Sequence, residues 1–455
     1  MKKMIPIWLG LFLFFILPIQ SYASTFDEVK WLIQNEYVGE IKGDINRATT
    51  IDEMIDMLDP YSTYFTKEEF EAFTNSIDMT TVGIGVEIEK HEKGILIVNV
   101  FEGGSAYQAG VVAGDIIISV NGQSIVDLSI EQAQALLLGN ENTTVDITFL
   151  KKDGSKTTKT IARLPFSIPN VTSKLLYGNV GYIALSSFSE NGTTLVKNAY
   201  TKLKNQGATS FILDLQNNGG GYVTTAEKLI GMFPNAPYAY KLHMAQDSYL
   251  ETSISQSVKF PKDTRILVNR YSASASEMTV AALIDQKAAI VYGETTYGKG
   301  TMQTLYPLSD GGYLKLTMAE FFGPNGTPVK NVGLTPHVVT TTNPIFTAHY
   351  DSIANQYPTY KKGNALRNVP VSKTFKMTFN KPVNDQIASN AIELVELGGS
   401  KVEVTFEVSD NQVFITPVKP LKAGDQYLLI VHPTIQDKDG KALKSGQYVH
   451  ITVKD

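Results

Sequence analysis

The stretch 265–293, RILVNRYSASASEMTVAALIDQKAAIVYG, contains an apolar run, a turn of small residues, a helical pattern and a second apolar run. Runs 265–268 and 289–292 are short and apolar, as buried strands are, and 275–286 fits a helix. A strand, a helix and a further strand in this order predict parallel pairing in a βαβ unit. The preceding chain repeats the pattern, with strands expected at 180–185 and 211–215 and helices at 194–206 and 223–232. Residues 164–340 are therefore predicted to form an α/β core.

The composition narrows the kinds of chemistry that the chain can carry. It has 455 residues, which is enough for about three domains, and a formal net charge of −5. Because it contains no cysteine, disulfides, zinc–thiolate sites and a cysteine nucleophile are excluded. No block of basic residues is present, and nucleic acid is not expected as a partner. The six histidines form no HExxH-like pair. We therefore expect no metal and no cofactor.

The N-terminus has the features of an export signal. Lys2 and Lys3 precede an apolar run from Ile5 to Ile19, and Ser21-Tyr22-Ala23 is a small-x-small cleavage site. The apolar run is shorter than the roughly 20 residues of a membrane-spanning helix. Residues 1–23 are predicted to be a secretory signal, with an uncleaved anchor as the alternative. The protein is expected to work outside the cytoplasm, secreted or associated with the cell envelope.

The remaining segments differ from the α/β core in pattern. Residues 24–79 space their apolar side chains as a helical segment does, and 80–163 alternate short strands with turns around one helical pattern. A polar, irregular stretch, 341–368, is expected to be a linker with some helix. Residues 369–455 contain five alternating apolar runs, which predict a small all-β sandwich. The expected fold is thus multidomain, with an α/β core flanked by a helical segment, a β-rich domain and a sandwich.

Ser274 lies in the turn between a predicted strand and a predicted helix. A side chain there is exposed at the edge of the sheet, and the N–H groups of the helix N-terminus point toward it, which suits a nucleophile. Ser274 to Glu277 also fits an S-x-x-E capping box, so a purely structural role is the alternative. Ser272 and Ser276 are neighbouring candidates.

Lys299 is placed between two glycines in the loop that follows the next predicted strand. A solvated loop lysine is the ordinary interpretation of such a residue. If the loop buries it, however, desolvation lowers its pKa and allows it to take a proton from a serine hydroxyl. Asn217 to Gly221 form a third element, a glycine run after strand 211–215. It fits either a flexible turn or a loop whose N–H groups stabilise an oxyanion.

Three ordered motifs, FILDLQNNGGG at 211–221, SASASE at 272–277 and YGKGTMQ at 297–303, resemble the carboxyl-terminal processing peptidases, also called tail-specific proteases. The resemblance extends over about 27–340 and includes LDPYS at 58–62. It implies a Ser–Lys peptidase in which Ser274 is the nucleophile, Lys299 the general base and Gln303 the residue that orients the lysine. It also implies an oxyanion hole made by Ala275 with Gly220 or Gly221.

Segment 80–163 resembles a PDZ domain in GGSAYQAG at 103–110 and GDIIISVNG at 114–122. The resemblance places a carboxylate-binding loop at Gly83, Ile84, Gly85 and Val86, and it implies capture of protein or peptide substrates with apolar C-terminal tails. Relatives often carry an arginine before the glycine that ends the PDZ helix, where this chain has Leu138. Coupling through that contact is therefore in doubt.

The C-terminal segment resembles a bacterial immunoglobulin-like domain of the surface-layer type, in 375–383 and 421–427. It implies a spacer or an adhesion role and no chemistry. By analogy with relatives, region 25–79 is a candidate for homodimerisation. The sequence as a whole predicts an exported serine endopeptidase that captures C-terminal tails. The alternative is a tail-binding scaffold that has lost its activity.

Overall fold

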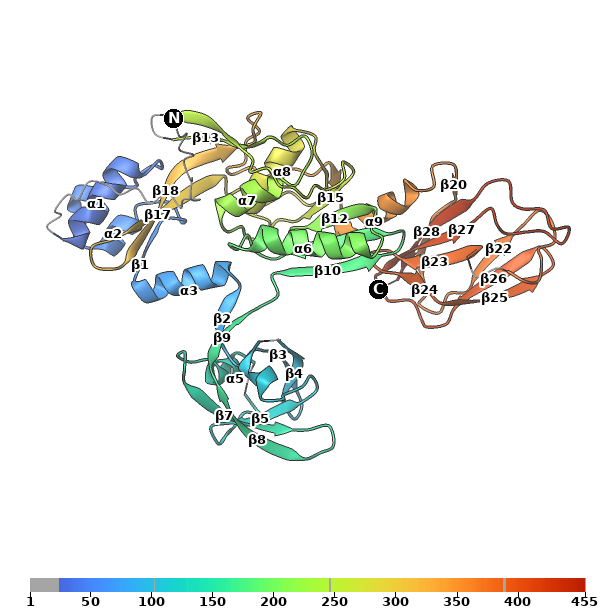
Figure 1. Ribbon diagram of the computed structural model, residues 1–455, viewed down its shortest axis with the longest axis horizontal. Helices are drawn as coiled ribbons and strands as arrows, with labels where there is room; N and C mark the ends of the chain where they lie inside the picture. Colours follow the sequence, from blue (N-terminus) through green and yellow to red (C-terminus); the bar gives the residue numbers. More distant parts are fainter. Residues whose placement is uncertain (1–23, 102, 129, 245–246, 388–389, 455) are drawn as a thin grey trace, which may run out of the picture.

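The computed structural model describes residues 24–101, 103–128, 130–244, 247–387 and 390–454. The predicted signal sequence, 1–23, lies outside these residues. Figure 1 shows an α/β core with a β-rich domain on one side and a sandwich at the C-terminal end, as predicted. Within the described ranges, no helix combines the length and the apolar character needed to cross a membrane.

The core is a six-stranded sheet in the order β10-β11-β12-β15-β16-β19, parallel except for the β10–β11 hairpin. Alternate residues of a strand face opposite sides, so Phe211 and Leu213 join the core under helices α6, α7 and α8, while Ile212 packs toward α9 on the other face. The elements are β10 (Val171–Leu176), β11 (Val180–Leu185), α6 (Gly192–Asn205), β12 (Ser210–Asp214), α7 (Val223–Ile230), β15 (Arg265–Val268), α8 (Ala275–Asp285), β16 (Ile290–Gly293) and β19 (Val338–Val339).

A second, antiparallel sheet joins the N-terminal segment to the core. β18 pairs with β1, β13 and β17, so a strand of the N-terminal segment is part of this sheet. Leu314 and Leu316 of β18 pack against the helical segment in one hydrophobic cluster. The elements are α1 (Thr25–Glu36), a 3-10 turn (Ile45–Arg47), α2 (Ile51–Ile55), β1 (Thr63–Phe65), α3 (Lys67–Ile77), β13 (Tyr238–His243), β14 (Ser248–Thr252), β17 (Thr301–Pro307) and β18 (Tyr313–Phe322).

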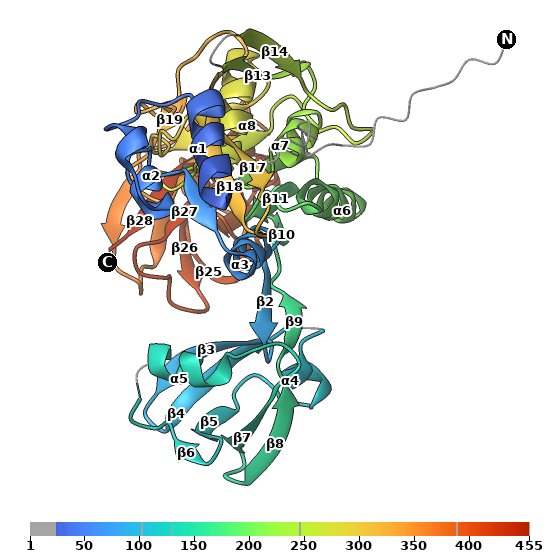
Figure 2. The same ribbon diagram turned by 90° about the vertical axis from the view of Figure 1, so that its left-hand side faces the viewer.

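The β-rich domain is connected to the core by a two-stranded ribbon. β2 (Thr80–Gly83) enters it and β9 (Leu164–Ser167) leaves it, and the two strands pair antiparallel; Figure 2 shows the domain beyond this ribbon. Its own core is separate from that of the α/β sheet. The elements are β3 (Val86–His91), β4 (Gly94–Val100), α4 (Ser105–Gln108), β5 (Ile116–Val120), β6 (Gln123–Ser124), α5 (Ile130–Leu137), β7 (Thr144–Leu150) and β8 (Lys156–Ala162).

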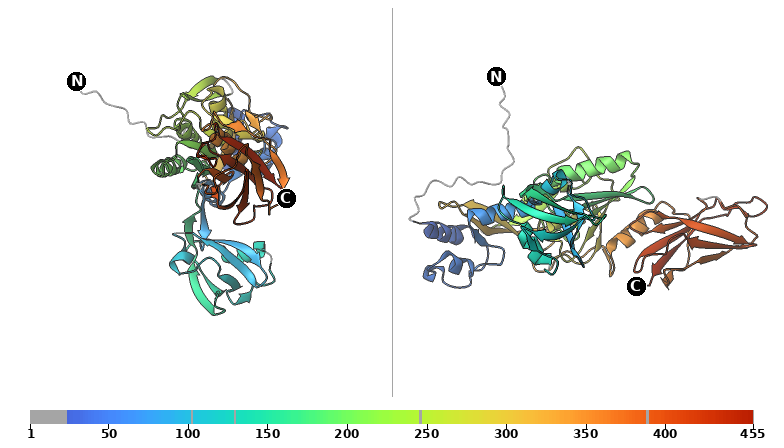
Figure 3. Two further views of the ribbon diagram at one scale, coloured as in Figure 1. Left: turned by 90° about the vertical axis from the view of Figure 1, so that its right-hand side faces the viewer. Right: turned by 90° about the horizontal axis from the view of Figure 1, so that it is seen from below.

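The C-terminal domain consists of two sheets that enclose a core of their own. It extends away from the α/β core at the end marked by α9, as the right-hand view of Figure 3 shows. The elements are α9 (Pro344–Ala354), β20 (Lys361–Lys362), β21 (Leu366–Val369), β22 (Phe375–Thr378), β23 (Ile392–Glu396), β24 (Lys401–Val402), β25 (Val404–Ser409), β26 (Gln412–Pro417), β27 (Gln426–Val431) and β28 (Gln447–Val453).

Helix α9 lies in the stretch expected to be a linker, and it contacts both neighbours. Its Ala348 joins a cluster with the α/β sheet, and its Ile353 joins a cluster with Leu428 and Ile430 of the sandwich. His349 is fully buried at the same contact: Nδ1 accepts the Gly398 N–H at 2.8 Å, and Nε2 is 2.9 Å from the Tyr177 carbonyl. The C-terminal domain is therefore packed onto the core through α9.

Candidate active site

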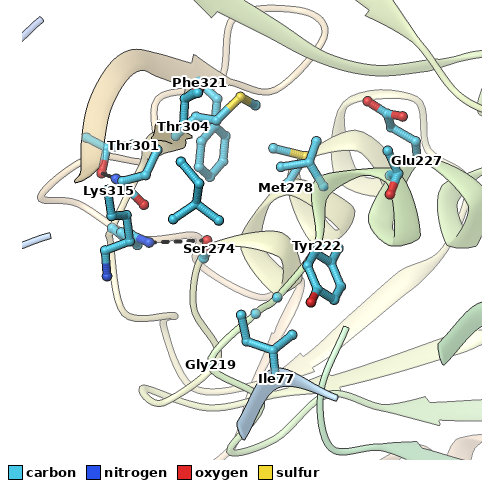
Figure 4. Close-up of a pocket in the computed structure, with 18 of the residues that line it drawn as sticks. Ile77, Gly219, Tyr222, Glu227, Ser274, Met278, Thr301, Thr304, Lys315 and Phe321 are labelled. Carbon is cyan, nitrogen blue, oxygen red and sulfur yellow. Dashed lines mark hydrogen bonds between the residues drawn. The ribbon is translucent and has the colours of Figure 1, made fainter. Parts of the chain in front are cut away.

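Ser274 occupies the last position before α8 and has an unusual backbone conformation. Its φ is 56° and its ψ is −114°, although it is not a glycine. A non-glycine residue held in such a backbone conformation costs roughly 1–3 kcal/mol, and backbone strain of this kind is concentrated at functional sites. The sharp turn directs Ser274 into a cavity of about 690 Å³ (Figure 4).

The two neighbouring serines are used structurally. Ser272 is fully buried, and its hydroxyl donates to the Leu215 carbonyl at 2.8 Å. Ser276 is fully buried as well, and its hydroxyl donates to the Asn218 carbonyl at 2.9 Å. Of the three serines in the motif, Ser274 is the one that lines the cavity.

Lys299 reaches the same cavity from the loop after β16. Its Nζ is 3.5 Å from Ser274 Oγ, at the outer limit of a hydrogen bond, and 5.1 Å from the centre of the Tyr61 ring. Burial lowers the pKa of Lys299 to about 8, and the charge of Lys315 acts in the same direction, against the opposing effects of Asp59 and Glu277. An amine with this pKa is largely deprotonated at mildly alkaline pH, which a general base requires.

Glu277 connects the two motifs. Its side chain is fully buried, and its carboxylate accepts hydrogen bonds from the N–H groups of Ser274 and Lys299, both at 3.0 Å. It also accepts the Gly298 N–H at 2.6 Å and the Thr296 hydroxyl at 2.7 Å. The S-x-x-E motif suggested a helix cap only. In the structure the same carboxylate also fixes the lysine loop, a role that sequence spacing does not reveal.

The glycine loop lies against Ser274. A methyl group added to Gly220 would be 2.7 Å from Ser274 Cβ and 3.0 Å from Ala275 N, so this position requires a glycine. The Gly220 N–H donates to Asn218 Oδ1 at 2.9 Å, whereas no hydrogen bond is recorded in the described part of the chain for the N–H groups of Gly221 and Ala275. Which glycine completes an oxyanion hole with Ala275 stays a prediction.

Gln303 lines the cavity, but within the described residues its side chain makes no hydrogen bond to Lys299. Its side-chain amide donates to the hydroxyls of Thr301 and Thr317, both at 3.0 Å. The predicted role of Gln303 in orienting the lysine therefore stays a prediction. Besides Ser274, Lys299 contacts Tyr61 through its ammonium group and Glu277 through its backbone N–H.

The cavity has an apolar wall beside Ser274. Figure 4 shows Met278 and Phe321 on this side and Lys315 on the side of the dashed contact to Ser274. A wall of this kind accommodates apolar side chains of a bound peptide. The described residues contain no group of three or more His, Cys, Asp or Glu side chains that could hold a metal ion.

The predicted carboxylate-binding loop lies at the end of the ribbon. Gly83 ends β2 and pairs with Leu164, and Val86 begins β3. Gly85 has a φ of 78° and lies so close to Gly104 that a Cβ would be 2.7 Å from the Gly104 Cα. The Ile84 side chain is buried, and its carbonyl accepts the Ala106 N–H at 2.8 Å. The loop is therefore a tightly held bend between the ribbon and β3.

Arg163 is a residue of this domain that the sequence did not single out. Its guanidinium is buried at the end of α5 and donates to the carbonyls of Leu136 and Leu137, both at 2.9 Å. A cation at a helix C-terminus is favourable. Arg163 immediately precedes β9, so it connects the end of the PDZ helix to the ribbon, next to the position held by the exposed Leu138.

Comparison with known proteins gives matches to three family models. Residues 179–340 match peptidase family S41, 96–151 a PDZ domain and 358–452 a bacterial Ig-like domain. These matches and the fold define a multidomain serine peptidase with two accessory domains.

The chain belongs to peptidase family S41. It is 31% identical over 401 residues to a probable CtpA-like serine protease of Staphylococcus aureus (strain N315), covering 85% of this chain and 79% of the relative. It is also 31% identical over 364 residues to the carboxy-terminal processing protease CtpA of Bacillus subtilis (strain 168), covering 78% and 77%. A solved photosystem II D1 C-terminal processing protease covers 73% of this chain and 96% of its own, with 24% identity and a TM-score of 0.45.

Proposed function

We propose that the protein is an exported endopeptidase that hydrolyses peptide bonds near the C-termini of protein substrates with a Ser274–Lys299 dyad. The observation that carries the proposal is the 3.5 Å approach of Lys299 Nζ to Ser274 Oγ in a cavity large enough for a peptide segment. The sequence relationship to carboxy-terminal processing protease CtpA supports the same activity.

In this mechanism the neutral Lys299 takes the Ser274 proton as Oγ attacks the scissile carbonyl. The oxyanion that forms is stabilised by the N–H groups of Ala275 and of Gly220 or Gly221, at the start of α8 and in the glycine loop. Lys299 then returns the proton to the leaving amine. Water hydrolyses the acyl-enzyme by the same route in reverse, and no cofactor takes part.

The PDZ domain is proposed to bind the C-terminal tail of the substrate. The bend at Gly83 to Val86 would hold the terminal carboxylate, while β3 and α5, which pack together, would border the tail. Tethering the tail raises the concentration of the cleavage site at the dyad. The signal features of the N-terminal sequence support a location of this activity outside the cytoplasm.

The test uses purified residues 24–455 and a Ser274→Ala variant, with an unfolded protein that ends in an apolar tail as substrate. Cleavage is measured by mass spectrometry. Cleavage by the parent chain and loss in Ser274→Ala are expected; cleavage that persists in the variant removes Ser274 from the nucleophile's role. If neither form cleaves but both bind the tail, the protein is a scaffold.

A further inference from the structure

A second lysine, Lys315, lies in the wall of the same cavity as Ser274 and Lys299. It comes from β18, where it pairs with Thr63 of the N-terminal segment on one side and Leu305 of β17 on the other. The neighbouring Leu314 and Leu316 face the N-terminal helices, so the pleat of the strand directs Lys315 toward the opposite, cavity side. Figure 4 shows it close to the contact between Ser274 and its base.

The surroundings of this ammonium group are unusual. Its Nζ lies over two aromatic rings, 5.3 Å from the centre of Phe65 and 4.7 Å from that of Phe73. Lys315 makes no ion pair and no hydrogen bond within the residues that the structure describes. A half-buried lysine normally has a carboxylate or carbonyl partner, because desolvation of the charge is costly. The two rings attract the ammonium group but carry no net charge, so they do not neutralise Lys315.

The charged and titratable groups around Lys299 come from four elements. The loop that carries Lys299 contributes Tyr297, α8 contributes Glu277, the turn before β1 contributes Asp59 and Tyr61, and β18 contributes Lys315. The Asp59 carboxylate accepts the N–H groups of its own turn, and its charge still attracts both lysines. Burial lowers the pKa of Lys315 as well, against this attraction. Lys315 is the one cation of this set besides Lys299 itself.

We propose that Lys315 is an electrostatic positioning residue for the reaction, whose positive charge in the cavity wall keeps Lys299 in its neutral, proton-accepting form. This inference rests on the function proposed above and adds the residue that sets the working pH of the base. Two ammonium groups in one apolar cavity disfavour the charging of each other. Burial lowers the pKa of Lys299 most, and the positive charge of Lys315 lowers it further.

The test compares Lys315→Met with Lys315→Arg, because methionine preserves the apolar stem without the charge and arginine preserves the charge. With a tailed substrate, kcat/KM is measured between pH 6 and 10. In Lys315→Met the midpoint of the rising limb is expected to move to higher pH by roughly one unit, the effect of one nearby like charge. Lys315→Arg is expected to keep the parental midpoint. An unmoved midpoint in Lys315→Met overturns the proposal.

A second measurement separates this inference from the proposed function. Trace acetylation of lysines at each pH, quantified by mass spectrometry on the peptide that contains Lys299, reports the titration of that amine without any turnover. A shifted labelling midpoint in Lys315→Met supports the inference even if the parent chain cleaves nothing. An increase in KM confined to acidic substrates, with an unchanged labelling midpoint, identifies Lys315 as a substrate contact and overturns the electrostatic role.

Discussion

The Glu277 carboxylate accepts the backbone N–H of Lys299 at 3.0 Å and thereby fixes the loop of the base to the helix of the nucleophile. The same carboxylate accepts the Ser274 N–H at 3.0 Å. A single buried group thus sets the relative positions of the two ends of the dyad, which come from different loops.

We expect Glu277→Gln to reduce kcat/KM by at least about tenfold. Glutamine keeps one acceptor oxygen, so its NH₂ group faces either the Gly298 N–H or the N–H groups of Ser274 and Lys299, and an unsatisfied buried donor costs about 1–3 kcal/mol. Peptide hydrolysis and urea unfolding are measured together. Loss of stability with unchanged kcat/KM would contradict a role for Glu277 in positioning the dyad.

The pH dependence of activity follows from the lowered pKa of Lys299. The neutral amine is the active form, so kcat/KM should rise with pH through about 8 and reach a plateau above it. Lys299→Arg should abolish turnover at every pH, because guanidinium does not lose its proton. A rising limb centred near pH 6 would assign the base to another group.

Lys299 also affects stability, and the sign can be worked out. Its folded pKa of about 8 is below the ordinary lysine value of 10.5, so between these pH values the unfolded chain binds more protons and stability rises with pH. Below pH 8 the full destabilisation is present, on the order of 3 kcal/mol. Lys299→Met should therefore raise the free energy of unfolding at pH 7, by an amount that disappears toward pH 10.5. Urea denaturation of both proteins at pH 7 and at pH 10.5 measures this difference. An equal gain in the free energy of unfolding at both pH values would contradict an origin in the lowered pKa of Lys299.

Gly85→Val should separate tail capture from hydrolysis. Valine is strained at a φ of 78°, and its Cβ would overlap the Gly104 Cα, so the carboxylate-binding loop cannot keep its shape. Cleavage of a tailed protein should fall severalfold through a higher KM, while hydrolysis of a short peptide without a free tail is unchanged. Gly154→Val is the control, since this glycine has a similar φ of 84° but open space around its missing Cβ, so the variant repeats the backbone strain without the overlap. Equal losses on both substrates would contradict a tail-binding role.

His349 predicts an acid-sensitive contact between the core and the sandwich. Burial lowers its pKa to about 4, below the ordinary 6.5, so its contribution to stability is complete above pH 6.5 and is lost as the pH falls toward 4. The loss approaches about 3 kcal/mol. Protonation of Nδ1 removes the acceptor of the Gly398 N–H. Limited proteolysis should release the C-terminal domain from the parent chain faster at pH 5 than at pH 7. Equal rates of release at the two pH values would contradict this role of His349.

Much of the fold followed from the sequence because the core strands are short, apolar and separated by amphipathic helices. Val180–Leu185 and Arg265–Val268 match the predicted bounds. β23, Ile392–Glu396, was missed because four of its five residues are buried, so it lacks the alternation of a half-exposed strand. β1 was missed because three residues are too few for a pattern, and its pairing with β18 is a contact over a long sequence separation.

The resemblance of the three motifs implied that Ser274 and Lys299 act as a pair. In the structure both follow neighbouring parallel strands, β15 and β16, at the same edge of the sheet. The contacts of these residues could not be predicted from the motifs. Tyr61, Glu277 and Lys315 meet Lys299 from three separate elements, and sequence spacing does not specify which side chains pack together across such distances. The same applies to Arg163, which binds helix carbonyls more than 20 residues away.

Helix α9 has a consequence for how such proteins diversify. A domain joined by a flexible linker can be exchanged between genes as a unit, because neither domain uses residues of the linker in its hydrophobic core. Here one helix supplies core residues to both sides, Ala348 to the peptidase sheet and Ile353 to the sandwich. Recombination within the helix would leave two incomplete cores, so the peptidase and its C-terminal domain are expected to be inherited together.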